Sequence, residues 1–522
     1  MQRLKMIYHL WESLPNSLAA IGTGLIVFTA CTVGPNYVKP TAEVPAAYKE
    51  IEGWKVAEPK DHLVRGAWWE IYNDPGLNAL EAKVNVSNQN IAQLEAQFRQ
   101  AQALVQVARA AYFPTATAGA SFTRSLRSSN VGGSTSSATS GTSKPPSKTS
   151  GVSTATSPVS DFLLPASASW EPDLWGRIRR TVEASKASAQ ASAADLESTR
   201  LLVQTEVAQN YFQLRTLDAQ KQLLDETVAA YQKFLALTEN RYARGVASRA
   251  DVLQAETQLK TTRAQAIDIG IQRAQTEHAI ALLVGKPASV FSISVAPLGA
   301  TPPAIPVGVP SDLLERRPDI AGAERRMAAA NAQIGVTVAA YYPTVTLSAS
   351  GGFEASNLAK WLSWPSRFWS IGTAISELVF EGGLRRAQTA QARAAYDATV
   401  ASYRQTVLAG FQEVEDNLAA LRILGEESRV QDEAVNAAQQ SVTVTTNQYK
   451  AGIVSYLNVI VTQTIALNNQ RTAIDILGRR MAASVLLVKA LGGGWDASIL
   501  GSGNDLGGSN DDPPPTQSKH LY

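Results

Sequence analysis

The chain is poor in the residues on which metal sites, disulfide frameworks and most catalytic centres depend. Its 522 residues include one cysteine and four histidines. A single cysteine excludes an internal disulfide framework and every cysteine-rich metal site. The histidines are His9, His62, His278 and His520. Their spacing fits neither a metal site nor a catalytic triad, and no Walker, EF-hand or Gly-x-Ser-x-Gly motif occurs, so we predict a non-enzyme without cofactor or metal.

Charge of one sign and long apolar runs are also scarce. The 47 Lys and Arg residues nearly balance the 45 Asp and Glu residues, and the net charge of +2 gives no electrostatic reason to expect a nucleic-acid partner. Beyond the N-terminus no apolar run reaches 18 residues, which excludes an ordinary transmembrane helix. If the mature chain meets a membrane, it must do so through strands or a surface anchor.

The first thirty residues have the pattern of a targeting segment. Two basic residues precede an apolar stretch of about 13 residues, too short to span a bilayer and typical of a signal-peptide core. We therefore predict a signal peptide at residues 1–30. Residues 28–31, Phe-Thr-Ala-Cys, resemble a bacterial lipobox, which implies lipidation of Cys31 with palmitate among its acyl chains. Ordinary signal cleavage with an unmodified thiol is the alternative.

The mature chain contains two copies of one unit. Pro114 aligns with Pro343, 229 positions later, and Gly245 aligns with Gly452, 207 positions later. The first copy therefore carries an insertion of 22 residues, between Pro114 and Gly176. Such internal similarity indicates a repeated structural unit rather than three unrelated globular domains.

Each copy is predicted to contain a helix, two strands around a loop, and two very long helices. The first long helix, Thr181 to Ala243, would be roughly 95 Å long at 1.5 Å per residue. Apolar residues recur in it at two heptad positions, as in a coiled coil. They are Leu196, Val203, Leu217, Leu224 and Tyr231 at one position and Val207, Leu214, Val228 and Leu235 at the other. Gly245 and Gly452 are predicted helix C-caps at tight hairpin tips.

The strands are predicted at about 114–125 and 160–172 in the first copy and 343–354 and 367–380 in the second. They alternate polar with apolar residues over about ten positions and are bordered by aromatics, which is the pattern of a transmembrane β-barrel. A soluble sandwich edge is the alternative. Four strands cannot close a barrel, and open edges are not tolerated in hydrocarbon, so the barrel must be shared between chains. Residues 125–160 and 493–522 are predicted to be a mobile loop and a disordered tail.

Several segments together resemble the outer-membrane factor family, the TolC-like efflux ducts, and particularly its OprM/NodT-like lipoprotein branch. They are residues 31–40, Trp68-Trp69-Glu70, residues 313–320 with Ala323-Glu324, and the two Tyr-x-x-Gly tips. The resemblance spans residues 31–495. It implies a homotrimer with a 12-stranded transmembrane β-barrel, continued by a long α-helical coiled-coil barrel with a mixed equatorial collar.

The resemblance also implies a domain organisation. The expected parts are a signal peptide (1–30), an N-terminal equatorial segment (31–75), repeat 1 (76–285), an equatorial linker (286–312), repeat 2 (313–492) and a tail (493–522).

The function implied is the outer-membrane channel of a tripartite efflux system. It would be a passive exit duct for drugs or other small molecules, lipid-anchored in the outer membrane of a Gram-negative bacterium with its helices in the periplasm. Its partners would be a periplasmic adaptor, an inner-membrane pump of the resistance-nodulation-division type, and outer-membrane lipid. The outer-membrane component of a type I protein secretion system, and a structural coiled coil without a pore, are the alternative functions.

The resemblance also assigns site residues. The adaptor-contact tips would be Gly245, Val246, Ser248, Gly452, Ile453 and Ser455. Relatives constrict the periplasmic entrance with acidic side chains, and the matching positions here are Asn458 and Val461. We therefore expect an amide and apolar constriction, which can gate by dewetting. The Arg316-Arg317-Pro318-Asp319 segment is interpreted as a helix start, because Pro318 suits the first turn and Asp319 the N-terminal dipole.

Overall fold

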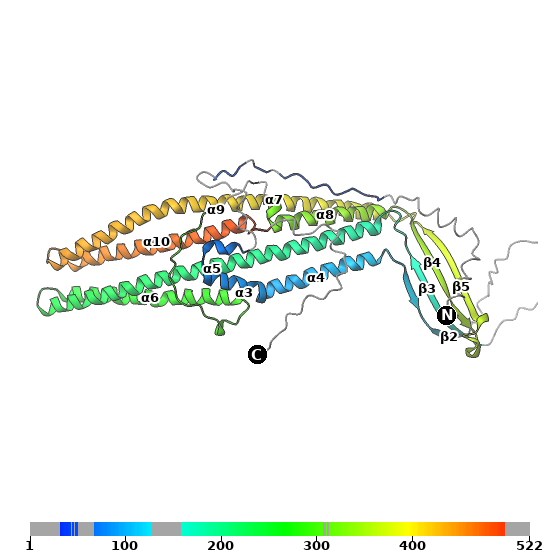
Figure 1. Cartoon of the computed structure of the whole chain (residues 1–522), viewed down its shortest axis with the longest axis horizontal. Coiled ribbons are helices and arrows are strands. Elements are labelled where there is room, and N and C mark those ends of the chain that lie inside the picture. The colour runs from blue at the N-terminus through cyan, green and yellow to red at the C-terminus, as the bar shows by residue number, and fades with distance from the viewer. Residues whose placement is uncertain are drawn as a thin grey trace, which may run out of the picture. The chain divides into compact units, whose positions relative to one another are not determined.

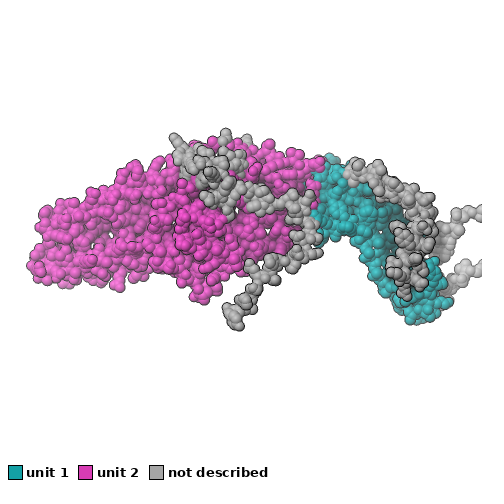
Figure 2. Space-filling view, viewed as in Figure 1, with its two compact units in different colours: residues 1–35, 106–182, 332–392 teal, residues 36–105, 183–331, 393–522 magenta. Residues whose placement is uncertain are grey.

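The computed structural model describes residues 32–42, 44–45, 47–50, 67–126, 158–305, 310 and 313–495 (Figure 1). The chain divides into two compact units (Figure 2). The sheet unit comprises residues 1–35, 106–182 and 332–392, and the helical unit comprises residues 36–105, 183–331 and 393–522. The expected signal peptide, Cys31, most of the predicted mobile loop and nearly all of the tail lie outside the described residues.

The sheet unit contains one antiparallel sheet. Its strands are β1 (Thr115–Ala118), β2 (Ser121–Ser125), β3 (Val159–Trp170), β4 (Thr344–Ala355) and β5 (Arg367–Ser376). The order is β1-β3-β4-β5, and β2 also pairs with β3. Because β1 and β2 follow one another along β3, the sheet is four strands wide.

Two strands differ from the sequence-based bounds. The predicted strand 114–125 is interrupted at Gly119, whose amide donates to the carbonyl of Pro165 at 3.0 Å. Pro165 lies inside β3 and has no amide proton, so a break in the neighbouring strand accommodates it. The predicted strand 367–380 ends at Ser376. Beyond it Arg385 turns back to bind the carboxylate of Glu381 at 2.9 Å and the carbonyl of Leu378.

The register separates an apolar face of the sheet from a polar one. On the apolar face Ala349 pairs with Ile371, and Val345 pairs with Ile375. Ile371 and Ile375 are 78% and 73% exposed, so nothing in the described chain covers this face. The polar face carries serine and threonine, and two cross-strand hydroxyl pairs there, Thr117 with Ser167 and Ser350 with Ser370, lie 2.8 Å apart. One water-facing and one apolar surface follow from the period-two alternation.

The helices form two sets of equal length. The matched pairs are α4 (Gln89–Ala110) with α8 (Pro318–Ala339), 22 residues each, α5 (Arg177–Ala243) with α9 (Leu384–Lys450), 67 each, and α6 (Arg249–Leu283) with α10 (Tyr456–Ala490), 35 each. Shorter elements are η2 (Trp68–Tyr72), α3 (Pro75–Ser87), η3 (Ala288–Val290), α7 (Leu313–Arg316), η5 (Leu358–Lys360) and η6 (Trp364–Ser366). In the described chain no helix has an apolar window that could cross a bilayer.

The four long hairpin helices end in the same way. The glycines at their ends, Gly245, Gly285, Gly452 and Gly492, all have positive φ. At each, the glycine amide bonds to the carbonyl three residues earlier, and the next amide bonds to the carbonyl five residues before itself. This is the Schellman motif, which requires a left-handed residue and satisfies the last helical carbonyls.

The largest core lies in the helical unit where α3 and η2 pack among the long helices. It contains Trp68, Leu77, Tyr211 and Phe212, all at most 2% exposed. We call this cluster the collar core. Seven of the nine predicted heptad residues of α5 are buried, whereas Val228 and Leu235 are only half-buried. The coiled-coil seam therefore packs within the chain over most of its length.

Candidate functional site

The two hairpin tips are exposed turns of the helical unit. Gly245 has a φ of +75° and Gly452 a φ of +78°. A Cβ atom built on either glycine would meet no atom within 4 Å. The residues that follow are exposed aliphatics, Val246 at 64% and Ile453 at 73%. Each tip thus presents bare backbone beside one apolar side chain.

The helix starts after the tips differ between the copies. Ser248 is the N-cap of α6, and its hydroxyl accepts from the Asp251 amide at 3.1 Å while Asp251 accepts from the Ser248 amide at 2.9 Å. This reciprocal pair is a capping box. Ser455 occupies the same place before α10 and makes no side-chain capping bond. The structure therefore brings all six predicted tip residues to two exposed turns, with one of the two serines acting as a cap.

An arginine missed by the sequence reasoning joins the two tips. The Arg241 guanidinium stacks 4.7 Å from the centre of the Tyr449 ring and donates to the carbonyls of Tyr449 and Lys450, each at 3.2 Å. Lys450 ends α9, so a cation sits where the dipole of that helix favours one. Tyr449 is 4% exposed, whereas its counterpart Tyr242 is 46% exposed. The sequence signal that could have found Arg241 is a difference between the copies: the position that aligns with Arg241 in the second copy is the neutral Gln448.

The expected constriction residues lie on an uncovered stripe of α10. Asn458 and Val461 are both exposed, and the stripe continues through Ile465 and Asn468 at spacings of three and four residues. Val461 is 49% and Ile465 50% exposed. The opposite face of α10 is buried. This pattern is that of an amphipathic helix, and its exposed stripe can contact water or another chain.

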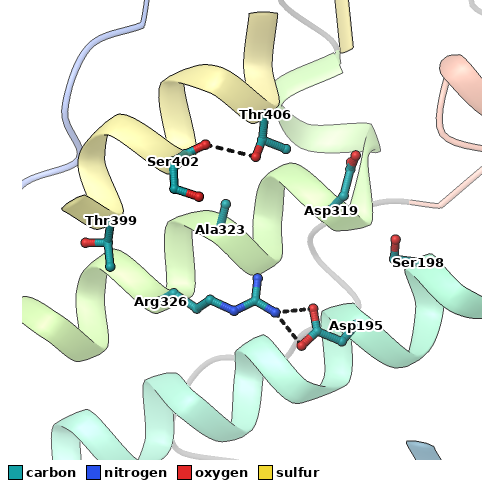
Figure 3. A pocket seen from close by; sticks show the side chains of 8 residues that line it. All are labelled: Asp195, Ser198, Asp319, Ala323, Arg326, Thr399, Ser402 and Thr406. Carbon is teal, nitrogen blue, oxygen red and sulfur yellow. Dashed lines mark hydrogen bonds and ion pairs between the residues drawn. The ribbon is translucent and has the colours of Figure 1, made fainter. Parts of the chain in front are cut away.

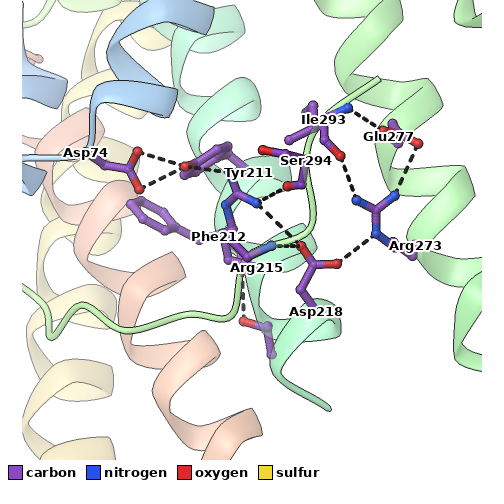
Figure 4. Close-up of polar contacts among 11 residues, drawn as sticks. Asp74, Tyr211, Phe212, Arg215, Asp218, Arg273, Glu277, Ile293 and Ser294 are labelled. Atoms are coloured by element: carbon purple, nitrogen blue, oxygen red, sulfur yellow. Dashed lines mark hydrogen bonds and ion pairs between the residues drawn. The ribbon is translucent and has the colours of Figure 1, made fainter. Parts of the chain in front are cut away.

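A buried polar network attaches the linker after α6 to the long helices (Figure 4). The fully buried Asp218 carboxylate accepts from Arg273 at 2.7 Å and from the Ala296 amide at 3.0 Å. Arg215 donates to the Ser294 carbonyl at 2.7 Å. These contacts hold residues 293–296 against the long helices, and a buried network of this kind fixes the position of the linker.

The same network extends to the start of α3. The Tyr211 hydroxyl donates to Asp74 at 2.8 Å, and Asp74 caps α3 by accepting from the Gly76 amide at 2.8 Å. Burial, reinforced by this carboxylate, raises the pKa of Tyr211 to about 12. A tyrosine with that pKa stays neutral at physiological pH and serves as a hydrogen-bond donor.

A shallow surface pocket lies between α5, α8 and α9 (Figure 3). Arg326 pairs with Asp195 at its edge, and hydroxyls such as Ser198, Ser402 and Thr406 line it. The Thr406 hydroxyl donates to the Ser402 carbonyl at 2.9 Å. No histidine lines the pocket to activate a hydroxyl. In the described part of the chain no group of three histidine, cysteine or acidic residues could hold a metal.

The Arg316–Asp319 segment is structural. Pro318 is the first residue of α8, in agreement with the helix-start interpretation. The 5%-exposed Arg317 donates to Asp319 at 2.6 Å, to Glu413 at 2.8 Å and to the Ala490 carbonyl at 3.2 Å. It thus ties the start of α8 to the middle of α9 and to the C-terminal end of α10. Cys31, the expected lipidation site, lies outside the described residues.

Comparisons with known proteins agree with this geometry. The profile of the family described as "Outer membrane efflux protein" matches residues 82–286 and 309–493. The chain is 30% identical over 437 residues to the pyoverdine export outer membrane protein OpmQ of Pseudomonas aeruginosa, covering 83% of this chain and 88% of the relative. It is 29% identical over 481 residues to the toluene efflux pump outer membrane protein TtgF of Pseudomonas putida, covering 90% and 95%.

Solved structures show the same fold. The outer-membrane channel OprN superposes with a TM-score of 0.79 at 28% identity, covering 89% of this chain and 100% of that one. The CmeC outer membrane channel of Campylobacter jejuni superposes with a TM-score of 0.81 at 21% identity, covering 91% and 97%.

Proposed function

The chain belongs to the outer membrane efflux protein family and is an outer-membrane efflux channel, and from this premise we propose that three copies form the passive exit duct of a tripartite efflux system. The duct transports without chemistry of its own. Small organic molecules are the proposed cargo, because relatives are named for toluene efflux and pyoverdine export. An inner-membrane pump of the resistance-nodulation-division type supplies the cargo through a periplasmic adaptor.

The two open edges of the sheet carry the trimer proposal. The β1/β2 edge and the β5 edge have no second partner strand in the described chain. Unpaired backbone is not tolerated in hydrocarbon, so each edge must pair with another copy. Four strands per chain and three chains give a closed barrel of twelve. The uncovered apolar face then meets lipid, and the serine and threonine face lines the lumen.

The tips support the adaptor contact. Open space around Gly245 and Gly452 lets a partner backbone approach closely, and the exposed Val246 and Ile453 offer apolar contact beside it. Helical hairpins that present short apolar anchors suit docking against other helices. The tips are therefore the proposed site for an adaptor, with Ser248 and Ser455 at the edges of that contact.

The exposed α10 stripe supports the constriction. In a ring of three chains, Asn458 and Val461 would line the periplasmic end of the duct. Amide and aliphatic rings hold no fixed charge, so we propose that the closed state excludes ions by dewetting rather than by an acidic ring.

The trimer is tested by heat-modifiable migration on gels and by conductance in planar bilayers. Wild-type protein should run as a trimer before heating and form discrete channels. A monomer without conductance would refute the duct. At the constriction, Val461→Asp should raise cation preference and current, and an unchanged current would remove Val461 from the pore.

The adaptor contact is tested by Gly245→Trp and Gly452→Trp. Both should abolish cross-linking to the adaptor and export, while trimer migration stays normal. Gly299→Trp is the matched control, because Gly299 is also an exposed glycine with open space around it but lies in the linker after α6. Unchanged cross-linking in the tip variants would refute the contact.

A further inference from the structure

At the end of the sheet away from the helices, basic and acidic residues lie on opposite faces. This loop end comprises the C-termini of β2 and β4 and the N-termini of β3 and β5. Arg124 pairs with Ser160, two positions beyond the Phe122–Phe162 pair, and Arg367 pairs with Phe353.

Both arginines therefore lie on the apolar face, together with Ile371 and Ile375. The acidic residues lie on the opposite face. Asp161 pairs with Thr123, and Glu354 pairs with Leu163. These pairs are one residue along the strands from the pairs that contain the arginines, so their side chains point to the other face.

The surroundings of the arginines are aromatic and exposed. Arg124 and Arg367 are both exposed, and neither forms an ion pair with another described residue. The Arg367 guanidinium lies 3.8 Å from the centre of the Trp364 ring, which is itself 71% exposed. Phe122, two residues before Arg124, is 59% exposed. Aromatics with cations just beyond them mark the level where lipid chains give way to headgroups.

We propose that Arg124 of one copy and Arg367 of the next form a phosphate-binding pair at each seam of the trimer, occupied by a phosphorylated lipid of the outer leaflet. The proposal rests on the trimeric barrel proposed above. Strand β5 is one edge of the sheet and β2 lies on the other, so closing the barrel pairs them. Antiparallel pairing along their length brings their loop ends together, and both arginines there face lipid.

The chemistry favours a lipid phosphate. Two guanidinium groups can hold one phosphate through paired, charge-assisted hydrogen bonds, which a lysine cannot reproduce. Because the helical part is periplasmic, the loop end is the outer side of the barrel. The adjoining Phe122 and Trp364 offer apolar surface to acyl chains, which a free phosphate would leave uncovered. The acids Asp161 and Glu354 face the lumen and leave the outer surface positive.

The first experiment measures retention of diphosphoryl lipid A. Full-length trimers are reconstituted in phosphatidylcholine vesicles doped with this lipid, and the bound lipid is counted by native mass spectrometry. The double variant Arg124→Gln/Arg367→Gln should bind at least about tenfold more weakly, because hydrogen bonds to charged groups are strong. Asp161→Asn/Glu354→Gln is the matched control and should bind like wild type. Equal binding by all three proteins would overturn the proposal.

The second experiment tests whether the site is shared between copies. Homotrimers of Arg124→Gln alone or of Arg367→Gln alone have no intact seam. Mixed trimers of the two variants have a seam with both arginines, so they should regain binding. Failure of the mixed trimers to bind would overturn the shared site, because no single chain in them carries both residues.

Two further readouts separate the possible failures. Inorganic phosphate added at the same concentration as the lipid should not displace bound lipid A. If it displaces the lipid, the site binds free anions rather than a lipid. Trimer migration and conductance should be normal in every variant. If the wild type itself forms no trimer, the proposed function fails; normal trimers without lipid selectivity would refute this inference alone.

Discussion

The two ends of the long hairpins use one turn motif under opposite constraints. At the tips, a Cβ atom on Gly245 or Gly452 would meet nothing within 4 Å. At the opposite ends, near the collar core, a Cβ atom on Gly285 would lie 2.1 Å from the Ser87 carbonyl oxygen, and one on Gly492 would lie 2.1 Å from the Arg316 carbonyl oxygen. The collar glycines thus serve both conformation and close packing, whereas the tip glycines serve conformation alone.

This difference distinguishes glycines that the fold of the chain requires from glycines beside surface that a partner can reach. A glycine pressed against another backbone is required by the fold of the chain itself. A glycine in open space is required only by its positive φ, and the space beside it is available to a partner. The same sequence signal therefore marks a structural joint at one end of a hairpin and a contact surface at the other.

The largest effect expected at neutral pH separates the two kinds of glycine. Gly285→Ala and Gly492→Ala should each destabilise the trimer by on the order of 4 kcal/mol, because left-handed strain adds to a backbone clash. Gly245→Ala and Gly452→Ala should each cost only about 1 kcal/mol. Thermal unfolding by circular dichroism at one scan rate compares the four. Equal losses of stability in the tip variants and the collar variants would contradict the distinction between the two kinds of glycine.

The collar core should also respond to pH. Glu81 is fully buried, and neither of its carboxylate oxygens has a hydrogen-bond partner among the residues that the structure describes. Desolvation by burial raises the pKa of Glu81 to about 9. The folded state therefore keeps a proton that the unfolded chain releases above its ordinary pKa of 4.5. The contribution of Glu81 to the free energy of unfolding should therefore be greatest below pH 4.5. It should fall as pH rises toward 9, by about 1.4 kcal/mol per pH unit at most.

Glu81→Gln tests this dependence. The variant has no proton to lose, so its unfolding temperature should stay level between pH 5 and about 9 where the wild type declines. Thermal scans in a series of buffers measure it. A wild type whose stability rises over that interval would contradict the neutral buried carboxyl.

A smaller effect is expected from the contact between the tips. Arg241→Ala removes a cation over the Tyr449 ring and two bonds to α9 carbonyls, and should cost about 1–2 kcal/mol. Hydrogen exchange of the amides at residues 449–455 should accelerate. Arg429→Ala is the control, because Arg429 is 73% exposed and its ion pair is with Glu433 in its own helix. If both variants exchange alike, the two tips are independent.

The smallest effect distinguishes one tip from the other. Ser248→Ala breaks a capping box and should cost about 1 kcal/mol. Ser455→Ala should be nearly neutral for stability because Ser455 makes no side-chain capping bond. Unfolding temperatures of the two variants provide the comparison. A loss at Ser455 matching that at Ser248 would show that the tips are capped alike.

The repeats and the tips could be predicted from sequence because their signals are local. The heptad pattern of α5, Pro343 before β4 and the paired Tyr-x-x-Gly motifs each act within a few residues. The break at Gly119 could not be predicted, because it depends on Pro165 across the sheet. The Asp74–Tyr211 contact and the Arg241–Tyr449 contact likewise join residues 137 and 208 positions apart, with no periodicity to announce them.

The equal helix lengths in the two copies restrict how this protein can change over evolutionary time. Adding one residue to a single arm would advance its tip by 1.5 Å and rotate everything beyond by about 100°. A change of length in one arm alone would therefore shift its tip and its packing face out of register with those of its counterpart. The 22-residue difference between the copies falls in the segment joining the strands, where added length alters no helical arm. Between the two copies of this chain the helical arms are therefore equal in length although their sequences differ, and the extra residues of the first copy lie between its strands.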